Sequence, residues 1–393
     1  MVGERRGTRT PDLERRGEPR MTEIPGASTG RGHVWIVAAG LNAHRQLLDS
    51  QPDDLTSFQK IHEGNDSDVN VWFASWSNTI FATDAGLRGI GHQKVLDNSK
   101  VLLVSPVGDH DGVLLALDSD GQLYRAEEQT EQGIVAMVCR STDSSPSIGR
   151  LAYAENGRVA ITIKQAPNGN LCHVEEFKDL ETFLRWFQDP SGDGNYPERH
   201  FMLPGRPKQL KAGTGIFVLL MESGQVYTWG DSRYRSLGRS VTGDGSKSAD
   251  EPAVLEALDG LHIKKVDCCG WMSAALSDDG ALYLWGITSP SDDVKIGALA
   301  AGEDEEVALV ELPGDGSEPL DVVDVALGVE HIAVLAESGR LFVTGDKSCG
   351  QLGLGDKQKS AECWQEVTLP SIEIEAVFCG PRSTLALVRS SPA

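Results

Sequence analysis

Residues 213–230 read GTGIFVLLMESGQVYTWG, and two later stretches repeat the same pattern. Residues 270–286 read GWMSAALSDDGALYLWG, and residues 328–345 read GVEHIAVLAESGRLFVTG. Each copy has a short apolar run, a polar turn that closes on glycine, and an alternating apolar strand that ends in glycine, which is typical of a β-hairpin. The turn glycines of the three copies lie 56 and 59 residues apart, and a period of that size indicates an array of similar units.

Weaker copies of the hairpin extend the series toward the N-terminus. They lie at residues 75–83, 113–124 and 151–161. A seventh copy is divided between the chain ends, because residues 34–40 supply one strand of a hairpin and residues 379–388 supply the other. Since a closed ring of such units removes the exposed edge strands, we predict an all-β, seven-bladed propeller over residues 32–389 whose two ends share one blade.

The strongest copies resemble the repeats of the regulators of chromosome condensation, in which a Gly-x-x-His-[Ser/Thr] strand precedes a Gly-x-[Val/Leu]-[Tyr/Phe]-x-Trp-Gly strand. The match is most specific at residues 227–238, 283–286 and 345–353, and it is weak in the second to fourth blades. Within this family the chain is most like the small single-propeller members, the RCC1-domain-containing proteins and the fungal alpha-tubulin suppressor.

The resemblance implies a non-catalytic scaffold that holds a partner enzyme or accessory factor. The partner would belong either to chromatin modification or to the machinery that modifies diphthamide and the transfer-RNA wobble uridine. Two alternatives stay open. The founding member of the family points to guanine-nucleotide exchange on a Ran-like small GTPase, and an acidic surface points to a reader of histones. A cytoplasmic or a nuclear location is expected.

Composition narrows the class of protein. The formal net charge of −22 repels phosphate backbones, so direct DNA binding is not expected. No apolar stretch approaches the roughly 18 residues that a membrane helix needs. The seven cysteines include no Cys-x-x-Cys pair, which favours a reducing compartment and argues against a metal site. We therefore expect a monomeric propeller without metal or cofactor.

No motif in the sequence indicates catalysis. A nucleophile elbow, a P-loop, a His-Glu-x-x-His pair and a dinucleotide fingerprint are all missing, so we do not expect an enzyme. His331 lies at the histidine position of the repeat, where the resemblance implies a role in blade packing.

Two segments depart from the repeat by their composition. Residues 1–31 interleave arginines with acidic residues, glycine and proline, and we predict a disordered tail in which Met21 is an alternative start. Residues 289–318 form a long acidic loop between the sixth and seventh blades, which is either simply solvated or engages a basic partner.

A third segment predicts a helix. Residues 175–189 have apolar side chains at helical spacing, inside an insertion of about 172–190 that we place between the fourth and fifth blades. The helix either packs against the side of the propeller or offers Phe183 and Trp186 to a partner.

The remaining candidate binding residues lie in loops, because packing occupies the strands. One rim of the ring should present the residues just after the Trp-Gly position: Asn42, His44, Arg45, Asp231, Arg233, Tyr234, Arg235, Asp346 and Lys347. The opposite position, before each incoming strand, offers Trp76, Trp271, Glu330 and Arg382. Exposed Trp and Arg are common interface anchors, although Trp271 could equally plug the central channel.

Overall fold

The computed structural model describes residues 34–51, 53–64, 69–97, 102–128, 134–164, 169–243, 245–291, 293–299, 306–314, 319–355, 360–369 and 372–390. The predicted tail at 1–31 lies outside these residues, as do 292, 300–305 and 315–318 of the predicted acidic loop.

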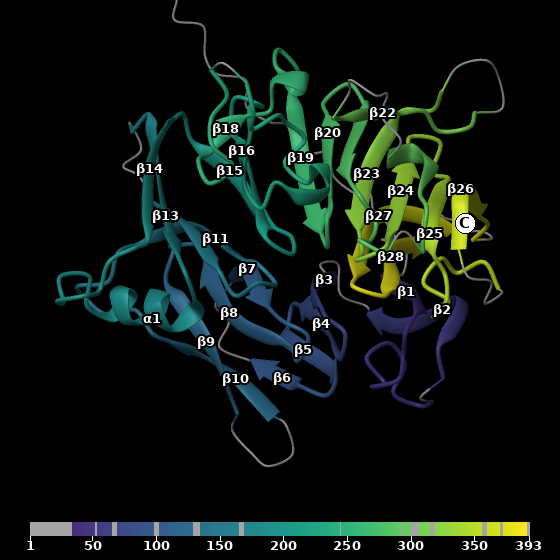
Figure 1. Cartoon of the computed structure of the whole chain (residues 1–393). Coiled ribbons are helices and arrows are strands. Elements are labelled where there is room, and N and C mark those ends of the chain that lie inside the picture. Colours follow the sequence, from purple (N-terminus) through teal and green to yellow (C-terminus); the bar gives the residue numbers. More distant parts are fainter. Residues whose placement is uncertain are drawn as a thin grey trace, which may run out of the picture.

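The described strands form a seven-bladed β-propeller, as the repeats predicted (Figure 1). Blade 1 contains β1 (Val34–Gly40), β2 (Leu55–Gly64), β27 (Ile372–Gly380) and β28 (Ser383–Ser390). Blade 2 contains β3 (Asn70–Ala74), β4 (Asn78–Thr83), β5 (Gly86–Gly91) and β6 (Lys94–Asp97). Blade 3 contains β7 (Leu103–Gly108), β8 (Val113–Asp118), β9 (Leu123–Glu128) and β10 (Ile134–Cys139). Blade 4 contains β11 (Ile148–Tyr153), β12 (Val159–Ile163), β13 (Leu171–Phe177) and β14 (Arg199–Pro204).

The three blades with the clearest repeats follow in the same order. Blade 5 contains β15 (Pro207–Ala212), β16 (Ile216–Met221), β17 (Val226–Gly230) and β18 (Ala253–Val254). Blade 6 contains β19 (Ile263–Cys269), β20 (Met272–Ser277), β21 (Leu282–Gly286) and β22 (Ala308–Val310). Blade 7 contains β23 (Val322–Leu327), β24 (His331–Ala336), β25 (Leu341–Asp346) and β26 (Ser360–Val367). The loops carry the helix α1 (Leu180–Gln188) and 3₁₀ turns at Arg233–Arg235, Glu256–Leu258 and Gly297–Leu299.

The two ends of the described chain close the ring in blade 1. β1 pairs antiparallel with β28 along its whole length, from Val34 opposite Arg389 to Gly40 opposite Ser383. The innermost strand of this blade, β27, contacts β23 of blade 7 on one side and β3 of blade 2 on the other. The predicted sharing of one blade between the N-terminal and C-terminal strands is therefore confirmed.

Blades 2 and 3 are joined more closely than the other blades. Their outermost strands, β6 and β10, pair in parallel, with Lys94 opposite Ile134 and Val95 opposite Val135. The two blades therefore form one eight-stranded sheet, in the part of the chain where the sequence repeat is weakest.

The apolar runs of the repeat are long because the second strand of a blade is buried on both faces. Successive side chains of β16 point to opposite faces of its sheet. Ile216, Val218 and Leu220 pack into the core shared with blade 6, and Phe217, Leu219 and Met221 pack into the core shared with blade 4. Every residue of β16 is buried, so the strand shows no polar alternation.

The glycine at the end of the third strand in blades 1, 2, 5, 6 and 7 is required by a close backbone approach. Gly286 and Gly345 have φ angles of +94° and +109°, a region that glycine enters more readily than residues with a side chain. A Cβ on Gly286 would lie 1.9 Å from the carbonyl oxygen of Trp271, and one on Gly345 would lie 2.2 Å from that of Glu330. The terminal glycine of the repeat therefore lets the loop after the third strand approach the loop before the second strand closely at the edge of the blade.

Side chains of the innermost strands link successive blades. An acidic or amide oxygen on one inner strand accepts a hydrogen bond from a backbone N–H of the next inner strand. The pairs are Gln209 with Val266 at 2.9 Å, Asp267 with Leu327 at 2.9 Å, and Asp324 with Val377 at 3.0 Å. These bonds connect blades 5, 6, 7 and 1 in turn.

Blade 4 differs from the prediction in two ways. Residues 175–177 belong to β13 and α1 follows it, so the helix lies between the third and fourth strands of blade 4 rather than between blades 4 and 5. The hairpin at 151–161 contains the first and second strands of its blade, whereas the turns at Gly224, Gly280 and Gly339 join second and third strands. A single hairpin pattern does not distinguish these two positions, because both are antiparallel turns.

The helix packs against the propeller, so Phe183 and Trp186 are buried rather than presented at the surface as the alternative required. Phe183 and Phe187 are fully buried, and Trp186 is 8% exposed. The Phe177 ring of β13 lies 5.3 Å from the ring of Phe183 and 5.0 Å from that of Trp186. At its N-terminus the Asp179 carboxylate accepts a hydrogen bond from a backbone N–H of the first turn.

Candidate functional site

The two sets of predicted loop residues lie on the same rim of the propeller, not at opposite positions. In each blade the second and third strands are antiparallel, so the start of one lies beside the end of the other. Met272 pairs with Gly286, His331 pairs with Gly345, and Ser383 pairs with Gly40. The loops before the second strands and after the third strands therefore share one edge of the ring, which we call the Trp rim because it carries Trp76 and Trp271.

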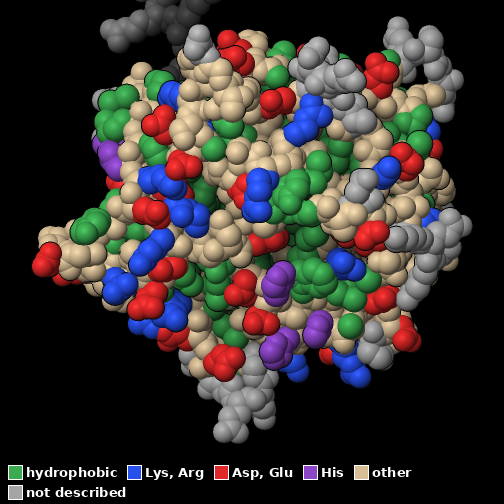
Figure 2. Space-filling model, viewed as in Figure 1, with side chains coloured by type: hydrophobic (Ala, Val, Ile, Leu, Met, Phe, Trp, Pro, Cys, Tyr) green, Lys and Arg blue, Asp and Glu red, His purple; other side chains and the backbone are tan. Residues whose placement is uncertain are grey.

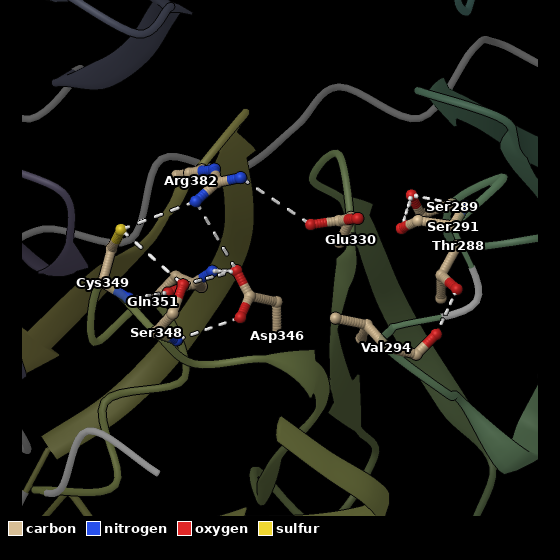
Figure 3. A network of polar contacts seen from close by, with 10 residues as sticks. All are labelled: Thr288, Ser289, Ser291, Val294, Glu330, Asp346, Ser348, Cys349, Gln351 and Arg382. Atoms are coloured by element: carbon tan, nitrogen blue, oxygen red, sulfur yellow. Dashed lines mark hydrogen bonds and ion pairs between the residues drawn. The ribbon is translucent and has the colours of Figure 1, made fainter. Parts of the chain in front are cut away.

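Arg382 links three loops of the Trp rim (Figure 3). It lies in the turn between β27 and β28, and its guanidinium reaches toward blade 7. One terminal nitrogen lies 3.8 Å from the Glu330 carboxylate, and the other lies 3.9 Å from the Asp346 carboxylate and 3.8 Å from Cys349 Sγ. The side chain is 31% exposed, so Arg382 is at once an anchor of the turn and part of the surface.

Asp346 organises the loop that follows β25. Its carboxylate accepts hydrogen bonds from Gln351 Nε2 at 2.7 Å, from Ser348 Oγ at 2.9 Å and from the Ser348 backbone N–H at 3.0 Å. Asp346 is 3% exposed and Lys347 is 6% exposed, so neither is presented to a partner as predicted. These bonds draw the loop inward and bury both residues.

Asn42 is also buried, contrary to its prediction as a binding residue. Its side-chain oxygen accepts hydrogen bonds from the backbone N–H groups of Leu47 and Leu48, and its amide nitrogen donates to the carbonyls of Leu48 and Gln51. Asn42 therefore holds the loop after β1 in place, and the neighbouring His44 and Arg45 are exposed.

Trp76 forms the wall of a pocket on this rim. The guanidinium carbon of Arg382 lies 5.0 Å from the centre of the Trp76 ring, and the His110 ring approaches edge-on at 5.5 Å. The pocket has a volume of about 620 Å³ and is lined by His44, Trp76, Ser77, His92, His110 and Asp111. We call it the Trp76 pocket. In Figure 2, histidine side chains lie beside a hydrophobic hollow near the centre of the view, with acidic and basic side chains around it.

Sequence reasoning missed four of the pocket residues, namely Ser77, His92, His110 and Asp111. His92 follows Gly91, the glycine that ends the third strand of blade 2, as Asp231 follows Gly230 in blade 5. His110 and Asp111 lie just before the second strand of blade 3. The same positional rule would have found them, but the repeat is too eroded in blades 2 and 3 for the pattern to show where the strands end.

A second aromatic cluster joins blades 5 and 6 on the Trp rim. The Tyr234 ring meets the Trp271 ring edge-on at 4.9 Å, and the Arg233 guanidinium lies 5.5 Å from the Trp271 ring centre. Asp231 accepts two hydrogen bonds from Arg233 Nε at 3.0 and 2.9 Å, and these bonds hold the pKa of Asp231 below its usual value. Arg235 is exposed next to this cluster. The cluster thus presents at the surface an arginine that is ion-paired with Asp231, together with the rings of Tyr234 and Trp271.

His331 lies beneath the Trp rim and is fully buried. A Cβ on Gly328 would lie 1.9 Å from the imidazole Cε1, so the ring packs directly on the glycine backbone. The pKa of His331 is lowered to about 4, chiefly by burial and to a smaller extent by nearby Arg382, while Asp346 and a backbone hydrogen bond with Ser383 oppose the shift. The imidazole is therefore neutral at pH 7 and serves packing.

Two negative findings apply to the part of the chain that the structure describes. No group of three or more His, Cys, Asp or Glu side chains is arranged to hold a metal ion. No helix there has the length and hydropathy to cross a membrane.

Comparisons with known proteins agree with this architecture. The regulator of chromosome condensation (RCC1) repeat matches residues 223–276, and a second form of the repeat matches residues 322–351. RCC1 domain-containing protein 1 is 31% identical over 48% of this chain in Mus musculus and 30% identical over 46% in Homo sapiens. These matches span 58% and 55% of the two relatives, little more than half of their length.

Larger and more distant proteins share the repeat as well. The human E3 ubiquitin-protein ligase HERC2 is 29% identical over 75% of this chain, which corresponds to 6% of HERC2. The crystal structure of Prp20p from Saccharomyces cerevisiae, described with its binding properties to Gsp1p and histones, superposes with a TM-score of 0.67 at 16% identity, covering 95% of this chain and 97% of Prp20p. The chain thus carries RCC1 repeats in two stretches and is similar to RCC1-repeat proteins, with a seven-bladed propeller fold like that of Prp20p.

Proposed function

We propose that this protein is a non-catalytic scaffold that binds a partner protein on the Trp rim. The observation that carries the proposal is the pairing of each rim tryptophan with an arginine, Trp76 with Arg382 and Trp271 with Arg233. The few residues that dominate the binding energy of a protein interface are enriched in Trp, Tyr and Arg. Here both pairs lie at one edge of a closed ring.

The scaffold presents these anchors in a nearly fixed geometry. Arg233 is held by Asp231, and Arg382 is held by Glu330 and Asp346. Side chains that are already ordered lose less conformational entropy on binding, which leaves more of the contact energy as affinity. The rim is therefore suited to a partner that docks as a folded surface or an inserted loop.

The partner that we propose is a modifying enzyme or an accessory factor, in the nucleus or the cytoplasm. The likeness to part of the E3 ubiquitin-protein ligase HERC2 supports a modifying enzyme as the partner, because there the matching repeats belong to an enzyme. The likeness to Prp20p supports the fold alone, so exchange on a small GTPase enters as a competing outcome of the experiment below.

The test is capture of partners by the purified full chain from a native extract. Wild type is compared with the double variant Trp76→Ala/Trp271→Ala and with Leu309→Ala, an exposed apolar residue of the outer strand β22. We expect a stoichiometric partner that the double variant loses and Leu309→Ala retains. Absence of such a partner, or equal capture by all three proteins, would overturn the scaffold.

Nucleotide exchange is measured in parallel. The release of labelled GDP from Ran is followed with a substoichiometric amount of the chain. Acceleration that depends on Trp76 and Trp271 would replace the scaffold with an exchange factor, whereas an unchanged release rate supports the scaffold.

A further inference from the structure

The Trp76 pocket lies where three blades meet on the Trp rim. His44 comes from the loop after β1, Trp76 and His92 come from loops of blade 2, and His110 and Asp111 precede β8 of blade 3. A pocket built from loops of three blades is shaped by the closed ring, and its volume of about 620 Å³ is in the range of specific ligand sites.

The backbone of Asp111 is held firmly while its carboxylate stays at the surface. Its N–H donates to Asp109 Oδ1 at 2.9 Å, and its carbonyl accepts from Asn78 Nδ2 at 2.6 Å and from Ser77 Oγ at 3.2 Å. Asp111 is exposed, and within the described ranges no cation pairs with its carboxylate. The pocket thus has at its edge an exposed carboxylate on a backbone that is held in place, with no ion pair to it among those residues.

The positive charges around the pocket are directed elsewhere. Arg382 lies between the carboxylates of Glu330 and Asp346, so its charge is offset by two acidic groups. Arg45 donates to the carbonyl of Asp49. In a chain of net charge −22, this leaves the region around the exposed Asp111 carboxylate attractive to a cation.

The walls of the pocket suit a long side chain with an apolar stem. Arg382 covers one face of the Trp76 indole, and the rest of the ring faces His110 and the pocket. Lysine and arginine lay their methylene stems on apolar surface and keep a charged head near a polar group. An acidic or phosphorylated side chain would instead meet the Asp111 carboxylate at close range.

We propose that the Trp76 pocket receives a lysine or arginine side chain from the partner, with its stem on the Trp76 indole and its cationic head at Asp111. This inference rests on the proposed function, because the basic side chain would come from the protein held on the rim. It adds the chemistry of recognition: the partner inserts a basic residue into an acidic hollow.

The experiment uses small probes and therefore needs no partner. Full-length protein with ¹³C-labelled histidine rings is titrated with N-acetyl-arginine methylamide, with the neutral isostere N-acetyl-citrulline methylamide, and with N-acetyl-glutamate methylamide. Single His→Gln variants assign the ring signals. We expect the arginine probe to shift the signals of His44, His92 and His110 with a millimolar dissociation constant, and to leave the distant exposed His262 unchanged.

Matched variants test the role of the charge. Asp111→Asn should weaken binding of the arginine probe about fivefold or more, because a charge-assisted hydrogen bond is lost. Asp120→Asn removes the same charge from the turn between β8 and β9, at the far end of β8, and should leave binding unchanged. Equal shifts by the arginine and citrulline probes, no shifts by any probe, or an unaltered Asp111→Asn titration would each overturn the proposal.

The two proposals fail separately. If the arginine probe binds as expected and no partner is captured, the preference of the Trp76 pocket for a basic side chain is supported and the scaffold function is contradicted. If a partner is captured through the Trp rim and the arginine probe does not bind, the scaffold proposal stands and the proposal that the Trp76 pocket receives a basic side chain is wrong.

Discussion

The guanidinium carbon of Arg382 lies 5.0 Å from the centre of the Trp76 ring. Arg382 belongs to the last hairpin of the chain, in blade 1, and Trp76 belongs to blade 2. The contact therefore spans the junction beside the shared blade, where the ring closes. One arginine both braces this junction and supports the wall of the pocket.

Replacing Arg382 with glutamine should lower the free energy of unfolding by about 1–2 kcal/mol, because a cation–π contact and two ion pairs of a partly buried arginine are lost. Urea denaturation measures the change. The matched control is Arg389→Gln, which breaks an arginine–glutamate pair between β28 and β27 away from the Trp rim. Arg389 is about as exposed as Arg382, at 27% against 31%, but it pairs with one carboxylate rather than two and that carboxylate is itself 31% exposed, so loss of the pair should cost less than about 1 kcal/mol. A larger effect of Arg389→Gln would contradict the assignment of Arg382 as a brace.

Replacing Glu176 with glutamine should lower the stability of the fold more than the same change at the neighbouring Glu198. The Glu176 carboxylate is 1% exposed and accepts hydrogen bonds from Arg158 at 2.6 Å, from Arg199 at 3.2 Å and from Trp229 Nε1 at 3.1 Å. Glu176→Gln leaves two partly buried arginines without their shared anion and should cost about 2–4 kcal/mol, measured by urea denaturation. The more exposed Glu198, which pairs with the same Arg158, is the control.

For that control, Glu198→Gln should cost less than about 1 kcal/mol. Similar losses for the two variants would mean that burial of the Glu176 carboxylate contributes little to the junction of blades 4 and 5.

Phe183→Ala should destabilise blade 4 by about 3–5 kcal/mol, because it removes a fully buried ring and leaves a cavity beside Phe177. Thermal and urea unfolding measure the loss. Arg185→Ala, on the exposed side of the same helix, should change stability by less than about 0.5 kcal/mol. If Phe183→Ala left stability intact and abolished partner capture, α1 would be a docking element after all.

His331 should make stability depend on pH between about 6.5 and 4. Burial lowers its pKa in the folded protein to about 4, so between these values the unfolded chain binds a proton that the folded protein does not. Stability should therefore be fully present above about pH 6.5 and fall as the pH drops toward 4, by at most roughly 3 kcal/mol from this group.

The check compares urea unfolding of wild type and His331→Gln from pH 7.5 to 4.5. The carboxylates titrate in both proteins, so the difference between them isolates the histidine. The variant should show the shallower slope, and parallel curves would show that His331 does not titrate differently on unfolding.

Much of the fold could be predicted because its signals are local. The strand alternation, the turn glycines and the glycine at the end of the third strand in five of the blades each depend on only a few neighbouring residues, and an unpaired strand at 34–40 required its complement at 379–388. The position of the helix was harder to predict. The hydrophobic spacing of 175–189 indicated α1, but the end of β13 at Phe177 depends on pairing with β12 and β14, which lie outside that window.

The candidate site was predicted only in part. Position in the repeat predicted that Trp76, Trp271, Arg233 and Arg382 lie in loops at the edge of the ring, but it divided them between two rims where the structure has one, and it also selected Asn42, Asp346 and Lys347, which are buried. Exposure of a loop residue depends on which partners its polar atoms find, and those partners lie several residues away or in another loop.

The amino-acid sequence by itself determined the seven hairpin units, their order and the meeting of the two described ends, because backbone periodicity and glycine conformations act over short stretches. Only the tertiary structure decided that Arg382, Trp76, His110 and Asp111 come together on one rim. Side chains from different blades meet when the ring closes, and that closure depends on the packing of all seven sheets at once.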